Sequence, residues 1–199
     1  MRKKIIAGLI LLVLFLGISM LVSSRNSGIH EIDTVVNNAG LASQTSTLTY
    51  LMSHITRLGD GGDLTIIVIV ALVIFMLLAE WRMAACLGFG FLFVNLLTSY
   101  LKNFYLIARP NMPLASNIGN WSYPSGHTTG VTIVFLILAL GLSRIVKNRP
   151  MKVLCVTICG SIIFLVGVSR IYLGVHWFSD VIGGWMLAGG IGYIVCGFF

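Results

Sequence analysis

The sequence is dominated by long apolar runs that short polar segments interrupt. Apolar residues make up 57% of the chain and charged residues 10%, whereas soluble domains carry about 25% charged residues. Runs of about 18 or more apolar residues are typical of membrane-spanning helices, because lipid cannot satisfy the backbone polar groups of any open segment. The pattern excludes a soluble globular protein and predicts an all-α polytopic membrane protein. The net charge of +7 is spread between the apolar runs, so we expect no nucleic-acid partner.

Six segments are apolar and long enough to span a bilayer, and we expect them to form one membrane-embedded domain over residues 1–199. The predicted spans are Ile5–Val22, Leu64–Ala79, Ala84–Leu101, Thr128–Ser143, Val153–Val168 and Val181–Phe199. The first run follows three basic residues, as a secretory signal does. It is longer than the usual signal core and has no clear cleavage site, so we expect this helix to be retained. In the last run, Gly184, Ala188 and Gly192 recur at four-residue intervals, which predicts close packing of another helix.

Basic residues are distributed unequally between the two sides of the predicted bundle. One side holds eight of them: Arg2, Lys3, Lys4, Arg82, Arg144, Lys147, Arg149 and Lys152. The other side holds five: Arg25, Arg57, Lys102, Arg109 and Arg170. Because loops rich in Lys and Arg stay in the cytoplasm, this distribution predicts a multi-pass protein of a bacterial-type cytoplasmic membrane with both termini cytoplasmic.

Two longer polar segments, residues 23–63 and 102–127, lie on the predicted outer side. Within the first, apolar residues recur at helical spacing among polar ones: Leu48, Leu51, Met52, Ile55 and Leu58. This spacing predicts one short amphipathic helix, which either lies in the membrane interface or packs between spans. The sequence leaves open whether this helix gates lipid entry. The glycine-rich stretch 59–63 predicts a turn into the second span.

Lys102 and Arg109-Pro110 form the first of three polar constellations in the outer half of the chain. A separation of seven residues is close to two helical turns, so on a continuing helix both cations would face the same way, roughly 10 Å apart. Pro110 would then end that helix. Two basic residues that snorkel to lipid headgroups would give the same pattern.

The second constellation is the tetrapeptide Pro124-Ser125-Gly126-His127, immediately before the fourth span. A helix N-terminus presents unpaired N–H groups and a positive dipole end, which favour an anion. Gly126 permits close approach of a ligand, Ser125 adds a hydroxyl, and His127 can donate a proton near neutral pH. An ordinary helix cap is the simpler interpretation of this tetrapeptide alone.

The third constellation is Ser169-Arg170 followed by His176 and Asp180. The last two are four residues apart, so on a helix they would share a face within hydrogen-bonding reach. A carboxylate that holds one imidazole nitrogen orients the ring and leaves the other nitrogen free to attack. Arg170 offers a planar fork for phosphate oxygens. A salt bridge at the membrane interface is the alternative.

Taken together, the three constellations supply three cations, two histidines, a carboxylate and a hydroxyl on one predicted side of the membrane. This inventory suits phosphoryl transfer, in which cations stabilise the phosphoryl oxygens while a nucleophile and an acid act on opposite sides. We therefore expect an active site at the outer face. A non-catalytic transporter or receptor for anionic lipids is the alternative from another class.

The three motifs resemble the signature of the type 2 phosphatidic acid phosphatase superfamily, which reads K-x6-RP, PSGH and SR-x5-H-x3-D. Every signature position is present between Lys102 and Asp180. In size the chain is similar to bacterial membrane lipid phosphatases of the phosphatidylglycerophosphatase type. The resemblance implies hydrolysis of phosphatidylglycerophosphate to phosphatidylglycerol and phosphate, with undecaprenyl diphosphate as the alternative substrate.

The resemblance also implies a metal-independent mechanism through a phosphohistidine, with no cofactor. Its catalytic residues would be His176 as nucleophile, Asp180 as its orienting carboxylate and His127 as acid and then base. The residues that would hold the phosphoryl oxygens are Lys102, Arg109, Ser125, Gly126 and Arg170. The expected partners are a membrane lipid phosphate and the bilayer, with no obligatory protein partner.

Overall fold

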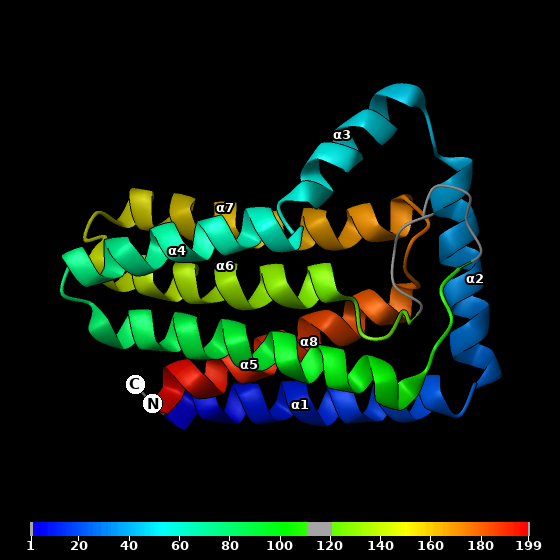
Figure 1. Ribbon diagram of the computed structural model, residues 1–199, viewed down its shortest axis with the longest axis horizontal. Helices are drawn as coiled ribbons and strands as arrows, with labels where there is room; N and C mark the ends of the chain where they lie inside the picture. The colour runs from blue at the N-terminus through cyan, green and yellow to red at the C-terminus, as the bar shows by residue number, and fades with distance from the viewer. Residues whose placement is uncertain (1, 111–120, 199) are drawn as a thin grey trace.

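The computed structural model describes residues 2–110 and 121–198, and within those ranges every regular element is an α-helix (Figure 1). The helices are α1 (Arg2–Ser23), α2 (Ser27–Ala42), α3 (Ser46–Arg57), α4 (Gly61–Leu77), α5 (Trp81–Tyr105), α6 (Gly126–Ile145), α7 (Arg149–Tyr172) and α8 (Phe178–Phe198). The predicted all-α fold is confirmed. Residues 111–120 of the second polar segment and Phe199, the predicted end of the last span, lie outside the described residues.

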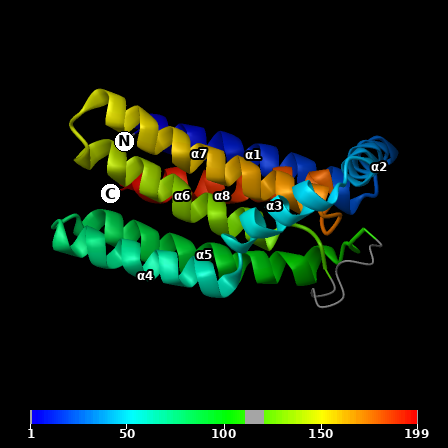
Figure 2. The same ribbon diagram turned by 90° about the horizontal axis from the view of Figure 1, so that it is seen from above.

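The six predicted spans correspond to α1, α4, α5, α6, α7 and α8. Five of these have 20 or more residues and are long and apolar enough to cross a membrane. Helix α4 has 17 residues, and it counts as a sixth span together with α3, from which a bend of 49° separates it. The spanning helices lie side by side, whereas α2 crosses the end of the bundle opposite both termini (Figures 1 and 2).

Helix α8 packs closely against α6 through the small residues that the sequence predicted to do so. A Cβ atom at Gly184 would lie 3.0 Å from Cβ of Thr128, and one at Gly192 would lie 2.8 Å from Cδ2 of Leu136. Ala188, between the two glycines, is fully buried. The N-termini of α6 and α8 meet at the α2 end of the bundle, where the backbone N–H of Ser125 donates to the carbonyl oxygen of Asp180 (3.1 Å).

Helix α2, which the sequence did not predict, makes hydrogen bonds to helix ends of the bundle. Its Asp33 carboxylate is buried and accepts hydrogen bonds from the backbone N–H (2.8 Å) and the hydroxyl (2.7 Å) of Ser179. An acidic group at this position also complements the N-terminal dipole of α8. At the corner between α2 and α3, Nε2 of Gln44 donates to the carbonyl of Tyr172 at the end of α7 (2.7 Å).

Helix α3 confirms the short amphipathic helix predicted from Leu48 to Leu58. One of its faces packs on the rest of the molecule, since Leu48 and Met52 contact the buried cluster around Tyr172. Tyr50 and Leu51 are exposed on the other face. The turn that follows α3 is the one predicted at residues 59–63, although α4 already begins at Gly61.

Candidate active site

The polar residues of the three sequence constellations meet at the end of the bundle that α2 crosses. His176 is at the centre of this cluster, in the loop between α7 and α8, and only 1% of its surface is exposed. Its Nδ1 atom lies 3.0 Å from Oδ2 of Asp180, and its Nε2 atom lies 3.0 Å from Nη1 of Arg109. Arginine only donates hydrogen bonds and a carboxylate only accepts them. The imidazole therefore carries its hydrogen on Nδ1 and keeps the lone pair of Nε2, as a nucleophile requires.

Asp180 reaches His176 from the first turn of α8. The predicted contact is confirmed, but the predicted shared helix face is wrong, because His176 precedes the helix. Asp180 instead folds back over the helix start, where its Oδ2 accepts the backbone N–H of Trp177 (2.8 Å). This is the carboxylate half of a capping box. Oδ2 of Asp180 thus contacts both the backbone N–H of Trp177 and Nδ1 of His176.

Ser122 is a third member of this group that sequence reasoning missed. Its buried hydroxyl donates to Oδ2 of Asp180 and lies 3.1 Å from Nδ1 of His176. The residue stands two positions before Pro124, at the edge of a motif whose other members were singled out. No periodicity or charge distinguishes it from other serines, so the sequence offers no signal for its role.

Lys102 and Arg109 both reach the cluster, but not from one helix as predicted. Helix α5 ends at Tyr105 because Leu106 adopts the left-handed conformation (φ 51°, ψ 38°), which ends a right-handed helix. Arg109 therefore lies on an irregular segment and donates to the carbonyl of Val175 (2.8 Å) as well as to His176. Lys102, still in the last turn of α5, donates from Nζ to the carbonyls of Trp121 (2.9 Å) and Ser122 (3.0 Å).

The tetrapeptide at residues 124–127 forms the start of α6. Ser125 is fully buried and caps the helix, accepting hydrogen bonds from the backbone N–H (3.4 Å) and hydroxyl (3.0 Å) of Thr128. Its own hydroxyl hydrogen is not used in these bonds. A Cβ atom at Gly126 would meet only Cε of Lys102, 3.9 Å away. The backbone at this helix N-terminus is therefore open next to a cation, as an anion site requires.

His127 and Arg170 contact a segment that the sequence did not connect with the site. Nε2 of His127 lies 2.7 Å from Oδ1 of Asp60, in the turn between α3 and α4. Arg170, in the last turn of α7, is 4% exposed and donates from Nη1 to the hydroxyl of Thr56 (2.7 Å). Its Nε atom is buried and makes no hydrogen bond to the described residues, so this donor is available to a phosphoryl oxygen.

The electrostatics of the cluster keep His176 neutral. Burial is the main cause that holds the pKa of His176 well below its usual range, and the neighbouring charges of Arg170, Arg109 and Lys102 act in the same direction. A neutral imidazole is the form that attacks phosphorus. A charge on His127 acts in the same direction.

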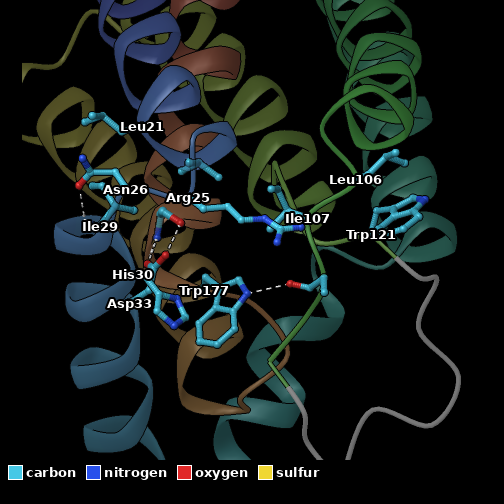
Figure 3. Close-up of a pocket in the computed structure, with 13 residues that line it drawn as sticks. Leu21, Arg25, Asn26, Ile29, His30, Asp33, Leu106, Ile107, Trp121 and Trp177 are labelled. Carbon is cyan, nitrogen blue, oxygen red and sulfur yellow. Dashed lines mark hydrogen bonds between the residues drawn. The ribbon is translucent and has the colours of Figure 1, made fainter.

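A pocket of about 670 Å³ lies beside the cluster (Figure 3). Its wall includes Ala108, Trp121 and Trp177, the direct sequence neighbours of Arg109, Ser122 and His176. Trp177 closes that wall by donating from Nε1 to the carbonyl of Ala108 (2.8 Å). On the opposite side the pocket is lined by the end of α1 and the start of α2, and the Arg25 side chain extends across it (Figure 3). The described residues contain no group of three or more His, Cys, Asp or Glu side chains that could hold a metal ion.

A buried histidine in contact with a carboxylate, with several cations around it at the end of a transmembrane bundle, is an arrangement that suits a membrane phosphatase. The chain belongs to the PAP2 superfamily, whose family model matches residues 83–199. It is 31% identical over 180 residues to phosphatidylglycerophosphatase B of Bacillus subtilis, covering 87% of this chain and 86% of that protein. Undecaprenyl-diphosphatase of Sulfolobus acidocaldarius is 36% identical over 75 residues, which are 38% of this chain and 32% of that protein.

Two solved structures share the fold. The crystal structure of a transmembrane PAP2-type phosphatidylglycerolphosphate phosphatase from Bacillus subtilis superposes with a TM-score of 0.84 at 28% identity, covering 96% of this chain and 94% of that one. The crystal structure of Aquifex aeolicus LpxE gives a TM-score of 0.66 at 23% identity, covering 83% and 94%, which shows the fold alone. The chain is thus a multi-pass membrane lipid phosphatase of the PAP2 superfamily.

Proposed function

We propose that this chain hydrolyses phosphatidylglycerophosphate to phosphatidylglycerol and phosphate through a phosphohistidine on His176, and that the whole chain acts as one membrane-embedded domain. The observation that carries the chemistry is the geometry of His176, whose Nδ1 is held by Asp180 while Nε2 faces the Arg109 guanidinium. The choice of lipid is supported by the similarity to phosphatidylglycerophosphatase B over 87% of the chain.

In the first step, Nε2 of His176 forms a bond to phosphorus while the bond from phosphorus to the glycerol oxygen breaks. His127 donates a proton to that departing oxygen, and Asp180 stabilises the positive imidazole that forms. For this attack, Arg109 must first release the lone pair of Nε2, and it donates to a phosphoryl oxygen instead. Lys102, Arg170, the hydroxyl of Ser125 and the backbone N–H of Gly126 hold the remaining negative charge, which is the usual role of cations and helix N-termini in phosphoryl transfer.

In the second step, water replaces the imidazole at phosphorus. His127, which has lost its proton in the first step, now accepts a proton from the water as its oxygen bonds to phosphorus. The bond between Nε2 and phosphorus breaks, and phosphate leaves with His176 neutral again. The site returns to its starting protonation state without any further reactant.

The pocket beside the cluster supports a substrate with a second phosphate. Phosphatidylglycerophosphate carries a phosphodiester between its two glycerols as well as the terminal phosphate that is hydrolysed. The Arg25 side chain lies in the pocket and makes no hydrogen bond or ion pair with the side chains or backbone of the described residues, so we propose that it binds the phosphodiester. Leu21, Val22 and Ile29 give the same pocket an apolar side for the start of the lipid tails.

Undecaprenyl diphosphate is the second candidate, because its diphosphate would also bring two phosphate groups to this site and a relative of that name matches part of the chain. The deciding experiment measures phosphate release by the purified protein from phosphatidylglycerophosphate, undecaprenyl diphosphate and phosphatidate. We expect the highest kcat/KM for phosphatidylglycerophosphate. Arg25→Gln should raise KM for that lipid and leave KM for phosphatidate, which has no second phosphate, unchanged. A higher kcat/KM for undecaprenyl diphosphate would overturn the choice of substrate.

We further propose that the protein lies in the cytoplasmic membrane with both termini in the cytoplasm and the site at the outer face. The excess of basic residues on the side of the termini supports this orientation, as does the position of the termini at the end of the bundle opposite α2 (Figure 1). The test is labelling of single cysteines, introduced at exposed Asn26 and Asn148, with a membrane-impermeant reagent in intact cells. Labelling of Asn26→Cys alone is the expected result, and labelling of Asn148→Cys alone would reverse the orientation.

A further inference from the structure

The turn between α3 and α4 contacts the predicted acid of the reaction, although it lies outside the three sequence motifs. Oδ1 of Asp60 is 2.7 Å from Nε2 of His127. Gly59 lies against the same edge of the ring, because a Cβ atom there would be 2.9 Å from Cδ2 of His127. The turn thus covers the edge of the imidazole formed by Cδ2 and Nε2.

The opposite edge of the same ring is open. Nδ1 of His127 makes no hydrogen bond to the described residues, and the side chain is 25% exposed. A carboxylate oxygen only accepts hydrogen bonds, so the hydrogen in the contact with Asp60 is on Nε2. Protonated His127 therefore has one proton committed to Asp60 and another, on Nδ1, that it can give away.

We propose that Asp60 is the positioning carboxylate of His127, so that only Nδ1 exchanges a proton during the reaction. In the first step, Nδ1–H goes to the departing glycerol oxygen, and His127 is left neutral with its hydrogen on Nε2. In the second step, the bare Nδ1 takes a proton from the attacking water. The hydrogen shared with Asp60 stays on Nε2 throughout, and no other reactant is needed. This inference deepens the proposed function and rests on the role of His127 in it.

Asp60 is the carboxylate that contacts His127 in the described part of the chain. The cations Arg170 on α7 and Arg109 after α5 belong to the same cluster, and His176 lies in the loop before α8. Nearby positive charge disfavours protonation of an imidazole, whereas an adjacent carboxylate favours it. Without that carboxylate, the imidazolium that must donate the proton would be stabilised only by solvent.

The decisive variant is Asp60→Asn, measured in the purified full-length protein against wild type. Asn keeps the shape of the side chain and is as good a helix N-cap as Asp, which matters because residue 60 is the N-cap of α4. Asp63→Asn is the matched control: it removes one carboxylate three residues away, whose Oδ2 lies 3.8 Å from Nε of the exposed Arg57. Asp60→Ser, another good N-cap, is a second variant in case the amide is poorly tolerated.

The measurement is the rate of phosphoenzyme formation with two leaving groups, over a range of pH. One substrate is a lipid phosphate monoester, whose alkoxide must be protonated as it leaves, and the other is p-nitrophenyl phosphate, whose leaving group departs as a stable anion. General acid catalysis contributes about 10²–10⁴-fold. We expect both Asp60 variants to lose about tenfold or more of the rate with the lipid and much less with p-nitrophenyl phosphate. The basic limb of the lipid pH profile should move to lower pH, and Asp63→Asn should behave as wild type.

The outcomes separate this inference from the proposed function. Equal losses for both leaving groups, or an unchanged rate and pH profile, would overturn the role of Asp60 while leaving the phosphatase in place. If wild type released phosphate from another lipid monoester but not from phosphatidylglycerophosphate, the proposed substrate would be wrong, and the role of Asp60 would be decided with the lipid that reacts. If wild type acted on no phosphate monoester, both proposals would fail.

Discussion

Two histidine–carboxylate pairs lie in the same polar cluster, and they are built in opposite ways. His176 and Asp180 are four residues apart, their side chains are 2% and 0% exposed, and they belong to one sequence motif. His127 and Asp60 are 67 residues apart, their side chains are 25% and 49% exposed, and only the histidine belongs to a motif. In the first pair the carboxylate contacts Nδ1 of the ring and leaves Nε2 on the other side, whereas in the second pair it contacts Nε2 and leaves Nδ1.

The proposed roles of the two imidazoles account for this difference. A nucleophile must hold one lone pair in a fixed direction, and burial with a carboxylate from the adjacent helix turn achieves this. An acid that later becomes a base must exchange a proton with a leaving group and with water, so it needs a more exposed nitrogen. We infer that the buried pair sets the reactivity of the site and that the exposed pair sets its protonation cycle.

The largest expected effect comes from removing the nucleophile. His176→Ala should abolish phosphate release, because no other side chain can form the covalent intermediate. The measurement is phosphate release from a lipid monoester, together with trapping of a labelled phosphoenzyme by acid quench. A variant that still forms the phosphoenzyme would show that another residue attacks phosphorus.

The orienting carboxylate of the buried pair should be nearly as important. In a serine protease triad, the corresponding Asp→Asn change lowers kcat by about 10⁴-fold because it favours the wrong tautomer. We expect Asp180→Asn to lower kcat by a similar factor, about 10³–10⁴-fold, and to cost more than Asp60→Asn. If the two asparagine variants lost equal activity, the contrast between the buried and the exposed pair would disappear.

Loss of the acid should leave more activity than loss of the nucleophile. His127→Ala removes a general acid, which contributes about 10²–10⁴-fold, so a slow turnover of lipid phosphate should remain. With p-nitrophenyl phosphate the first step should be almost as fast as in wild type. The burst of nitrophenolate in the first turnover measures that step, and its disappearance would assign His127 to phosphorus binding instead.

Ser122 sharpens the comparison, because no hydroxyl among the described residues contacts both members of the exposed pair. Its hydroxyl contacts both members of the buried pair, so Ser122→Ala should loosen the orientation of His176 without removing a charge. A hydrogen bond to a charged group is worth about 1.5–3 kcal/mol, which corresponds to roughly a tenfold to hundredfold loss in kcat with little change in KM. Ser125→Ala is the contrasting variant, since loss of a phosphate contact should raise KM as well.

The smallest expected effect is on the acid limb of the pH profile. In the proposed mechanism His176 reacts in its neutral form, and its pKa lies below the usual range because of burial and the surrounding cations. The usual value for histidine is about 6.5, so activity should persist below that pH and fall only as the pH drops through the lowered pKa. The pH dependence of kcat/KM measures this limb. An acid limb at or above pH 6.5 would contradict a lowered pKa of His176.

The fold was predictable because its cause is local: apolar runs long enough to cross a bilayer form helices wherever they occur. The contact between His176 and Asp180 was predictable for the same reason, although it arises from a helix cap rather than from a helix face. Lys102 and Arg109 converge by a route that the sequence did not show, since the left-handed Leu106 breaks the helix between them.

The missed residues are those whose role depends on contacts between distant segments. Asp60 stands in a glycine-rich turn that the sequence explained as a turn, and nothing near it in the chain points to a histidine 67 positions away. Helix α2 was missed because its two buried residues, Asp33 and Asn37, are polar, and Asp33 is buried by a contact with α8. Such pairings come from the packing of the bundle and carry no local signal.

The guanidinium of Arg109, which donates to Nε2 of His176, has a consequence for chemical labelling. An acylating reagent for histidine needs an accessible lone pair, and in the substrate-free enzyme that of His176 is both buried and occupied. His127 is partly exposed, and in its neutral form, with the hydrogen on Nε2, its Nδ1 is a bare nitrogen. Brief treatment should therefore modify the acid before the nucleophile, so the inactivated enzyme would keep the residue that attacks phosphorus chemically intact.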